Sequence, residues 1–111
     1  MKYTLSIDTS IRGESTIIVF GDDAQIYKKN TPSENSSRSV VSAVKDACTY
    51  LGIEPKSIGS VRVHTGPGSY TGLRVGAAVG QTIAAYFGIP LNGQSPDTPI
   101  EFQYDANDRW A

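Results

Sequence analysis

Alternating apolar and polar residues open the chain and predict a half-buried β-strand over residues 3–7 that ends at Asp8. A β-branched run at residues 15–20 and renewed alternation at residues 24–29 predict two more strands. The turn between them, Gly21-Asp22-Asp23, is typical of a hairpin. We therefore expect the chain to begin as a meander of three strands.

Helical spacing replaces this alternation after the polar stretch at residues 31–37. Apolar residues then recur three and four positions apart, at Val40, Val41, Val44, Ala47, Cys48 and Leu51. This spacing predicts a helix over residues 39–51 that ends at Gly52. A second helix is expected over residues 72–87, where Gly88 stops it.

Two further strands complete the predicted order β-β-β-α-β-α-β, a fourth at residues 58–65 and a short fifth at residues 89–92. Helical crossovers make strands one, four and five parallel, whereas strands two and three run antiparallel at one side of the sheet. The expected fold class is α/β, a single lobe with a mixed five-stranded sheet of the ribonuclease-H-like type. Residues 1–95 form this lobe, and residues 96–111 form an irregular, partly docked tail.

Composition narrows the class of protein. The chain has 111 residues, 39% hydrophobic and 19% charged, as in an ordinary globular domain. Its formal net charge of -1 provides no general attraction to nucleic acid or to an anionic membrane. No apolar run approaches the roughly 20 residues of a membrane span. The single cysteine, Cys48, cannot form an intrachain disulfide, so we expect a cytoplasmic protein with Cys48 buried as a small hydrophobe.

A glycine loop at residues 64–74, HTGPGSYTGLR, lies between an expected strand and an expected helix. Gly66 and Gly68 permit backbone conformations closed to other residues, and Ser69 or Thr71 can cap the helix that follows. Backbone N–H groups at such a helix start can hold an anion, which makes these four residues candidates for binding a phosphate or nucleotide. The alternative is a tight structural turn, because the lysine of a P-loop and the dinucleotide-binding glycine pattern are both missing.

Two neighbouring positions extend this candidate site. Arg74 falls in the first turn of the second helix, where the dipole disfavours a cation, so we expect a carboxylate or a bound anion beside it, with a salt bridge favoured. Asp8 and Thr9 follow the first strand at the carboxyl edge of the sheet, where ligands often bind, although Asp8 could merely cap a turn. His64 is expected to be a surface or packing residue. We find no credible set of metal ligands or catalytic residues.

Very small residues recur every four positions along the second helix, at Gly72, Gly76, Gly80, Ala84 and Gly88. Each glycine inside a helix costs roughly 1 kcal/mol relative to alanine, so close packing must offset the cost. Two explanations stay open: this stripe packs against the chain's own sheet or first helix, or it admits the backbone of a partner protein. The predicted interface consists of Val40, Val44, Gly72, Gly76, Ala77, Gly80 and Ala84. Leucine at Gly76 or Gly80 is then expected to impair dimerisation more than folding.

The residues Asp8-Thr9-Ser10 after the first strand, the nonamer from Gly66 to Arg74 and the small-residue helix behind it resemble the TsaB family, also called YeaZ. The resemblance covers residues 2–95, the amino-terminal lobe of that family. It implies an actin-like lobe of the ASKHA superfamily and a non-catalytic scaffold for the synthesis of threonylcarbamoyladenosine in bacterial tRNA. The family's second lobe has no counterpart here, which weighs against ATP hydrolysis.

The resemblance also implies partners. In this family the helices that match residues 39–51 and 72–87 bind the catalytic paralogue TsaD, and the nucleotide-binding protein TsaE joins the assembly. We therefore expect a heterodimer with a TsaD-like protein, contact with a TsaE-like ATPase, a homodimer when the partner is absent, only indirect involvement of tRNA, and no cofactor. Two other functions stay open: a degenerate nucleotide- or phosphate-binding domain that acts through the glycine loop, and a stand-alone interaction module.

Overall fold

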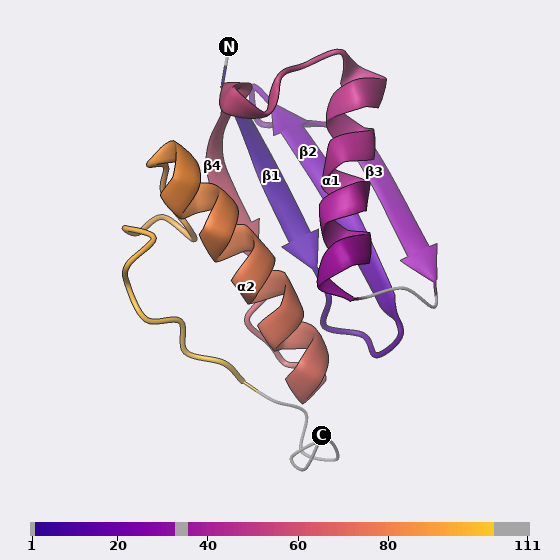
Figure 1. The fold of residues 1–111 in the computed structure, drawn as a ribbon, viewed down its shortest axis with the longest axis vertical. Coiled ribbons are helices and arrows are strands. Elements are labelled where there is room, and N and C mark those ends of the chain that lie inside the picture. The colour runs from indigo at the N-terminus through magenta and orange to yellow at the C-terminus, as the bar shows by residue number, and fades with distance from the viewer. Residues whose placement is uncertain (1, 33–35, 104–111) are drawn as a thin grey trace.

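The computed structural model describes residues 2–32 and 36–103, and its elements follow the predicted order (Figure 1). They are β1 (Tyr3–Asp8), β2 (Glu14–Gly21), β3 (Ala24–Pro32), α1 (Ser37–Leu51), the 3-10 turn η1 (Pro55–Ser57), β4 (Ile58–Val63) and α2 (Tyr70–Phe87). The predicted helices and first four strands are thus confirmed, with shifts of a few residues at their ends.

The sheet has the order β3-β2-β1-β4. β1 pairs antiparallel with β2, and β2 pairs antiparallel with β3. β1 pairs in parallel with β4, where Leu5 lies opposite Val61 and Ile7 opposite Val63. This register confirms the mixed sheet, and it brings the carboxyl ends of β1 and β4 to the same edge.

The predicted fifth strand is reduced to one bridge with the sheet, so the described sheet has four strands rather than five. Leu91 forms an isolated parallel bridge with Val61. The chain then turns, because Asn92 and Gly93 both have positive φ, 52° and 77°. The side chain of Asn92 instead accepts a hydrogen bond from the Val63 N–H, at 2.9 Å. The side-chain amide of Asn92 therefore accepts the hydrogen bond that a backbone carbonyl would accept if the strand were longer.

Local chemistry explains where both helices end. The hydroxyl of Ser36 caps α1 by accepting the Ser39 N–H, at 3.2 Å. Gly52 and Gly88 terminate α1 and α2 in the left-handed conformation, with φ of 68° and 65°, as their positions in the sequence predict. Because glycine carries no Cβ, each stop costs little strain.

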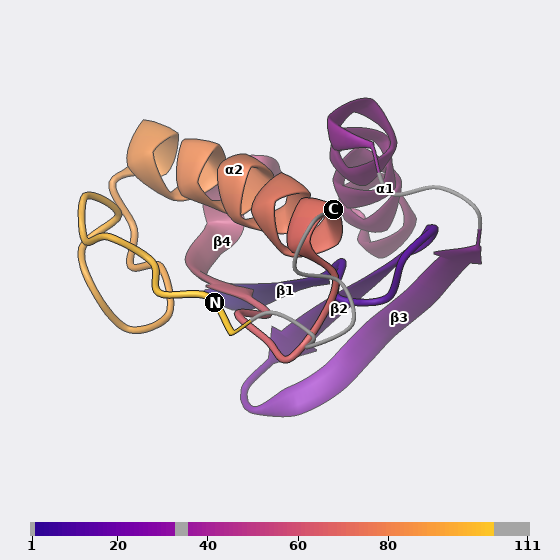
Figure 2. The same cartoon turned by 90° about the horizontal axis from the view of Figure 1, so that it is seen from below.

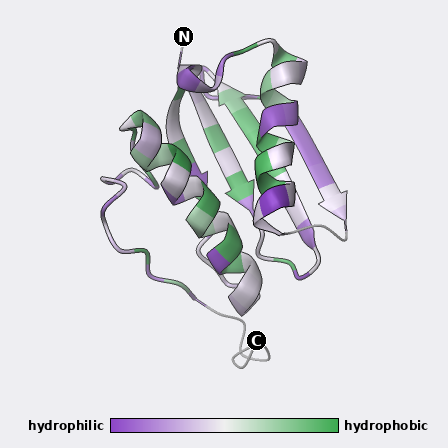
Figure 3. Cartoon of the chain, in the orientation of Figure 1, coloured by the Kyte–Doolittle hydropathy of each residue, from purple (hydrophilic) through white to green (hydrophobic). Residues whose placement is uncertain are grey.

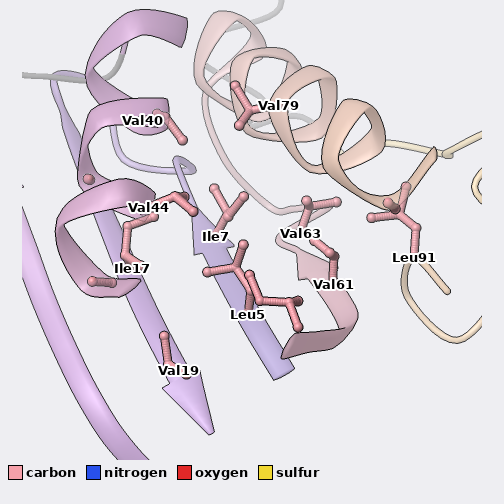
Figure 4. Close-up of a cluster of buried hydrophobic side chains, with 14 of the residues drawn as sticks. Leu5, Ile7, Ile17, Val19, Val40, Val44, Val61, Val63, Val79 and Leu91 are labelled. Atoms are coloured by element: carbon pink, nitrogen blue, oxygen red, sulfur yellow. The ribbon is translucent and has the colours of Figure 1, made fainter. Parts of the chain in front are cut away.

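Both helices cover the same face of the sheet (Figure 2), and the apolar core lies between them and the strands (Figure 4). The core includes Leu5, Ile7, Ile17, Val19, Val40, Val44, Val61, Val63, Val79 and Leu91. The edge strand β3 is largely hydrophilic (Figure 3). The alternation in β1 therefore sends its odd positions into the core and its even positions to the opposite face.

The tail docks along the side of α2 that faces away from α1 (Figure 1). The side-chain amide of Gln81 donates to the carbonyl of Pro96 at 3.0 Å, and the Gln103 N–H donates to the carbonyl of Thr65 at 2.8 Å. Between these bonds, Ile100 packs against the core. The predicted tail extends over residues 96–111, of which residues 104–111 lie outside the described residues.

Candidate functional site

The glycine loop is packed tightly by the chain itself. Gly66 has a φ of +130°, and a Cβ there would collide with the backbone carbonyl of Gln103. A Cβ on Gly68 would lie 2.6 Å from the Cβ of Ser10. Beside it, the Ser69 N–H donates to the carbonyl of Ser10 at 2.8 Å. The two glycines are therefore needed because two other segments of backbone approach the loop closely.

Ser69, rather than Thr71, is the N-cap of α2. Its buried hydroxyl accepts the Gly72 N–H at 2.9 Å, whereas Thr71 lies exposed within the first turn. The backbone N–H groups of Ser69 and Gly72 are thus both bonded within the chain. Because an anion site at a helix start relies on such N–H groups, this geometry favours the structural alternative for the loop.

Asp8 caps the turn that follows β1. One of its carboxylate oxygens accepts hydrogen bonds from the Ser10 N–H at 2.9 Å and from the Ser10 hydroxyl at 2.6 Å. The turn-capping alternative therefore accounts for this side chain. Across the described residues, no group of three or more histidine, cysteine or acidic residues is arranged to hold a metal ion.

Thr9 has a role that the sequence did not reveal. Its side chain is buried, 1% exposed, and its hydroxyl reaches into one turn of α2. There it donates to the carbonyl of Gly72 and accepts the Gly76 N–H, at 3.1 Å. A Cβ at Gly72 would collide with the Thr9 carbonyl, and one at Gly76 with the Thr9 hydroxyl. Two of the helix glycines are therefore required by Thr9, which directly follows β1.

The third glycine of the stripe is required by β4. A Cβ on Gly80 would collide with a methyl group of Val63 and would lie 3.3 Å from a methyl group of Val61. The stripe thus packs against the chain's own sheet, which was one of the two explanations for it. Gly88 is different, because it is the exposed cap of α2.

This packing corrects the predicted interface. Each residue of that set lies in the interior of the chain's own fold: Val40, Val44, Gly72, Gly76, Ala77, Gly80 and Ala84. The sequence pattern identified the close approach correctly, and of its two explanations the structure supports packing against the chain's own sheet. A partner that binds these helices would contact their exposed residues instead.

The exposed faces of α1 and α2 differ from the predicted set. They include Val41, Lys45, Thr82, Ala85 and Tyr86. Tyr86 is 82% exposed, and its ring packs edge-on against Phe87 with centroids 5.0 Å apart. Exposed tyrosines are enriched where proteins bind one another, because a rigid ring buries much area at small entropic cost. The sequence signal for this exposed surface was that apolar residues such as Val41 and Tyr86 fall outside the buried positions of α1 and α2.

Among the described residues, the contacts of Arg74 are with aromatic rings, and the carboxylate expected beside it stays a prediction. Its guanidinium carbon lies 4.8 Å from the centroid of Tyr70 and 5.7 Å from that of Phe102. Within the described residues, the ion pair observed is Lys56–Glu54, not one with Arg74. The negative faces of the two rings stabilise the cation that the helix dipole disfavours.

The remaining single-residue predictions hold. Cys48 is buried, and burial raises the pKa of its thiol, as expected of a small core hydrophobe. His64 is exposed just after β4, and its backbone N–H donates to the carbonyl of Ile7 at 3.0 Å. None of the helices in the described ranges has the length and apolar character that would let it cross a bilayer.

Comparisons with known proteins give a consistent result. A family model described as TsaD, tRNA N6-adenosine threonylcarbamoyltransferase, matches residues 30–95. The tRNA threonylcarbamoyladenosine biosynthesis protein TsaB of Bacillus subtilis strain 168 is 31% identical over 94 residues, or 85% of this chain. The matched region is 37% of the Bacillus protein, so the chain spans well under half of this relative.

Solved structures agree on the fold. YeaZ from Pseudomonas aeruginosa superposes with a TM-score of 0.73 at 20% identity, over 82% of this chain and 42% of that one. A second structure, that of an uncharacterised protein with similarity to peptidase YeaZ from Pseudomonas aeruginosa, gives the same TM-score, identity and coverage.

Proposed function

The chain belongs to the TsaB/YeaZ group of the family that the TsaD model defines, and we propose that it is a non-catalytic partner subunit in tRNA threonylcarbamoyladenosine biosynthesis. This membership confirms the resemblance inferred from the sequence. The proposed role in this biosynthesis comes from the name of the Bacillus relative. It is a proposal for this chain because the chain covers 37% of that protein.

The proposed partner is a TsaD-like protein that binds the exposed faces of α1 and α2. One observation carries this proposal: both helices lie on one side of the sheet (Figure 2) and present exposed apolar residues there. Val41 on α1 is 39% exposed, and Tyr86 on α2 is 82% exposed. The glycine stripe supports the arrangement indirectly, because it seats α2 firmly on β1 and β4 and so gives a partner a rigid surface.

A binding experiment tests the proposal. Mixing the chain with the TsaD-like protein of its own organism should give a heterodimer in light scattering, and Tyr86→Ala should weaken it by roughly tenfold or more. Tyr50→Ala is the matched control. Tyr50 is 78% exposed on α1, but its ring packs on Tyr27 of β3 with centroids 5.5 Å apart, away from α2. Absence of any heterodimer would contradict the proposal.

The wider assembly belongs to the same proposal. A homodimer in the absence of the partner predicts a molecular mass that rises with concentration, which Tyr86→Ala should suppress. Contact with a TsaE-like ATPase predicts a further increase in mass when that protein and ATP are added to the heterodimer. We also propose that the chain acts in the cytoplasm and contacts tRNA only through its partner. A stand-alone interaction module would bind a protein unrelated to TsaD.

Phosphate or nucleotide binding is the alternative function. The hydrogen bonds from the Ser69 and Gly72 N–H groups to the chain itself weigh against it. Calorimetric titration with ATP and ADP, with and without magnesium, separates the two proposals. A scaffold should give no appreciable heat, whereas saturable heat that Gly68→Ala abolishes in a folded protein would favour the nucleotide-binding alternative.

A further inference from the structure

One side of α1 carries two cations around an apolar residue. Arg38, Val41 and Lys45 are three and four positions apart, so their side chains lie on the same side of the helix. All three side chains are exposed. With Ser37 and Ser42 they line a hollow of about 430 Å³. We call the surface made of Arg38, Val41 and Lys45 the α1 basic face.

Among residues 2–32 and 36–103, no acidic side chain forms an ion pair with the α1 basic face. Asp46 is the single acidic residue of α1, and it acts on the opposite flank of the helix. There, burial raises the pKa of Tyr27 of β3, and the Asp46 carboxylate adds to that rise. The first turn of α1 contains Arg38 and no acidic residue, so the positive end of the helix dipole adds to the charge. The α1 basic face is therefore a region of uncompensated positive potential.

The neighbouring surface of α2 supplies no negative charge either. The two helices lie side by side and begin at the same end of the sheet (Figure 1). The exposed residues of α2 include Thr82, Ala85 and Tyr86, and the helix contains no acidic residue. Its one charged side chain, Arg74, contacts the ring of Phe102 in the tail, on the side away from α1. The surface that α1 and α2 share thus combines apolar residues with positive charge.

Two copies of the chain would match poorly through this surface. A two-fold dimer uses the same patch twice, so each α1 basic face meets either its own copy or an uncharged part of α2. The first arrangement places like charges together, and the second removes water from Arg38 and Lys45 without supplying an anion. A partner with carboxylates in those places would pair with both cations. Charge complementarity therefore favours a different, acidic protein over a second copy.

We propose that Arg38 and Lys45 select the partner of this surface, a protein whose contacting face carries acidic side chains opposite the two cations. Val41 and Tyr86 then supply apolar contact area, while the cations set the choice of partner. The inference deepens the proposed function and rests on it, since the partner is the TsaD-like protein. It adds that the same two cations weaken the homodimer.

Salt dependence tests the proposal on the full chain, with the TsaD-like protein of its own organism as the probe. Calorimetry or sedimentation gives the dissociation constants at low and at high salt. Screening of opposite charges should weaken the heterodimer roughly tenfold between about 50 mM and about 500 mM NaCl. Screening of like charges should strengthen the homodimer over the same range.

A neutral variant assigns the effect to these two residues. The double variant Arg38→Gln, Lys45→Gln keeps good helix formers at both positions, so folding should be unaffected. At low salt it should bind the TsaD-like protein roughly tenfold or more weakly than the unaltered chain, and it should form the homodimer more tightly. The matched control is Lys28→Gln, Lys29→Gln, which removes the same charge from exposed positions of β3. Neither equilibrium should change in the control.

The outcomes separate this inference from the proposed function. A heterodimer that the neutral variant forms as tightly as the unaltered chain would overturn the inference and leave the proposed function standing. So would a heterodimer whose affinity is independent of salt, or a β3 control that behaves as the neutral variant does. Absence of any heterodimer with the unaltered chain would contradict the proposed function, and the inference with it.

Discussion

The hydroxyl oxygen of Thr9 lies 3.1 Å from the backbone nitrogen of Gly76, where the end of β1 passes beneath α2. The same hydroxyl donates to the Gly72 carbonyl one turn earlier. A single buried side chain thus joins the sheet to two main-chain groups of the helix. Because a Cβ at Gly76 would occupy the space of that hydroxyl, the glycine and the threonine require one another.

Replacing Thr9 by valine tests this contact, because valine keeps the shape and removes the hydroxyl. We expect a loss of roughly 1–3 kcal/mol in the free energy of unfolding, since polar groups inside the protein lose a partner. Thr9→Ser keeps the hydroxyl and should retain more of the stability. Urea unfolding of the three proteins measures the difference. Equal stability of the valine variant and the parent would show that the hydroxyl is dispensable.

Gly80→Ala should affect folding rather than association. The added methyl group would collide with Val63, and such overpacking costs roughly 1–3 kcal/mol, which exceeds the roughly 1 kcal/mol gained in helix propensity. Urea unfolding should therefore show a net loss of stability.

Ala85→Leu, on the exposed side of the same helix, is the control in which association rather than folding should change. It should leave the unfolding midpoint nearly unchanged and weaken binding to the TsaD-like partner. If Gly80→Ala abolished association without loss of stability, the internal role of the glycine stripe would be wrong.

Most elements of the fold were predictable because each follows from a local pattern in the sequence. Alternation in β1, helical spacing in α1 and the glycine stops at Gly52 and Gly88 each depend on neighbouring residues. The reduction of the predicted fifth strand to a single bridge with the sheet was not predictable, because it depends on Asn92 adopting a positive φ and bonding through its side chain to Val63. Nothing in the pattern of residues 89–92 carries that information.

The candidate site was only partly predictable, for a related reason. Spacing along α2 showed that something approaches Gly72, Gly76 and Gly80 closely, but the identity of the neighbour is a tertiary fact. Thr9 is separated from Gly76 by 67 positions, so no local pattern joins them. Arg74 shows the same limit: the helix dipole predicted a stabilising neighbour, and among the described residues two aromatic rings are found in that place.

Arg74→Ala should therefore destabilise the protein in a manner that salt does not reverse. Loss of the contacts with Tyr70 and Phe102 should cost about 0.5–1 kcal/mol at this exposed position. An exposed ion pair would be screened as the salt concentration rises, so its contribution would shrink. Urea unfolding at low and high salt distinguishes the aromatic contacts from an ion pair. A difference between parent and variant that disappears at high salt would indicate an ion pair after all.

Cys48 gives a prediction about pH. Burial raises the pKa of its thiol in the folded state, so the folded protein holds this proton more tightly than the unfolded chain does. The resulting contribution to stability is fully present below the pKa of an unfolded cysteine, about 8.5, and is lost as pH rises through the folded-state pKa. Burial also raises the pKa of Tyr27, with Asp46 and Tyr50 adding to the effect. Its contribution to stability is therefore also lost as pH rises, but at higher pH than for the cysteine.

Cys48→Ala isolates the cysteine contribution to that pH dependence. Unfolding free energies measured from neutral to alkaline pH should fall more steeply for the parent than for the variant once the pH passes about 8.5. A thiol reagent provides an independent measurement, since only the thiolate reacts and a buried thiol is protected. Labelling at neutral pH should be slow in the native protein and fast in urea. Rapid labelling of the native protein would mean that α1 opens locally and exposes the core that it covers.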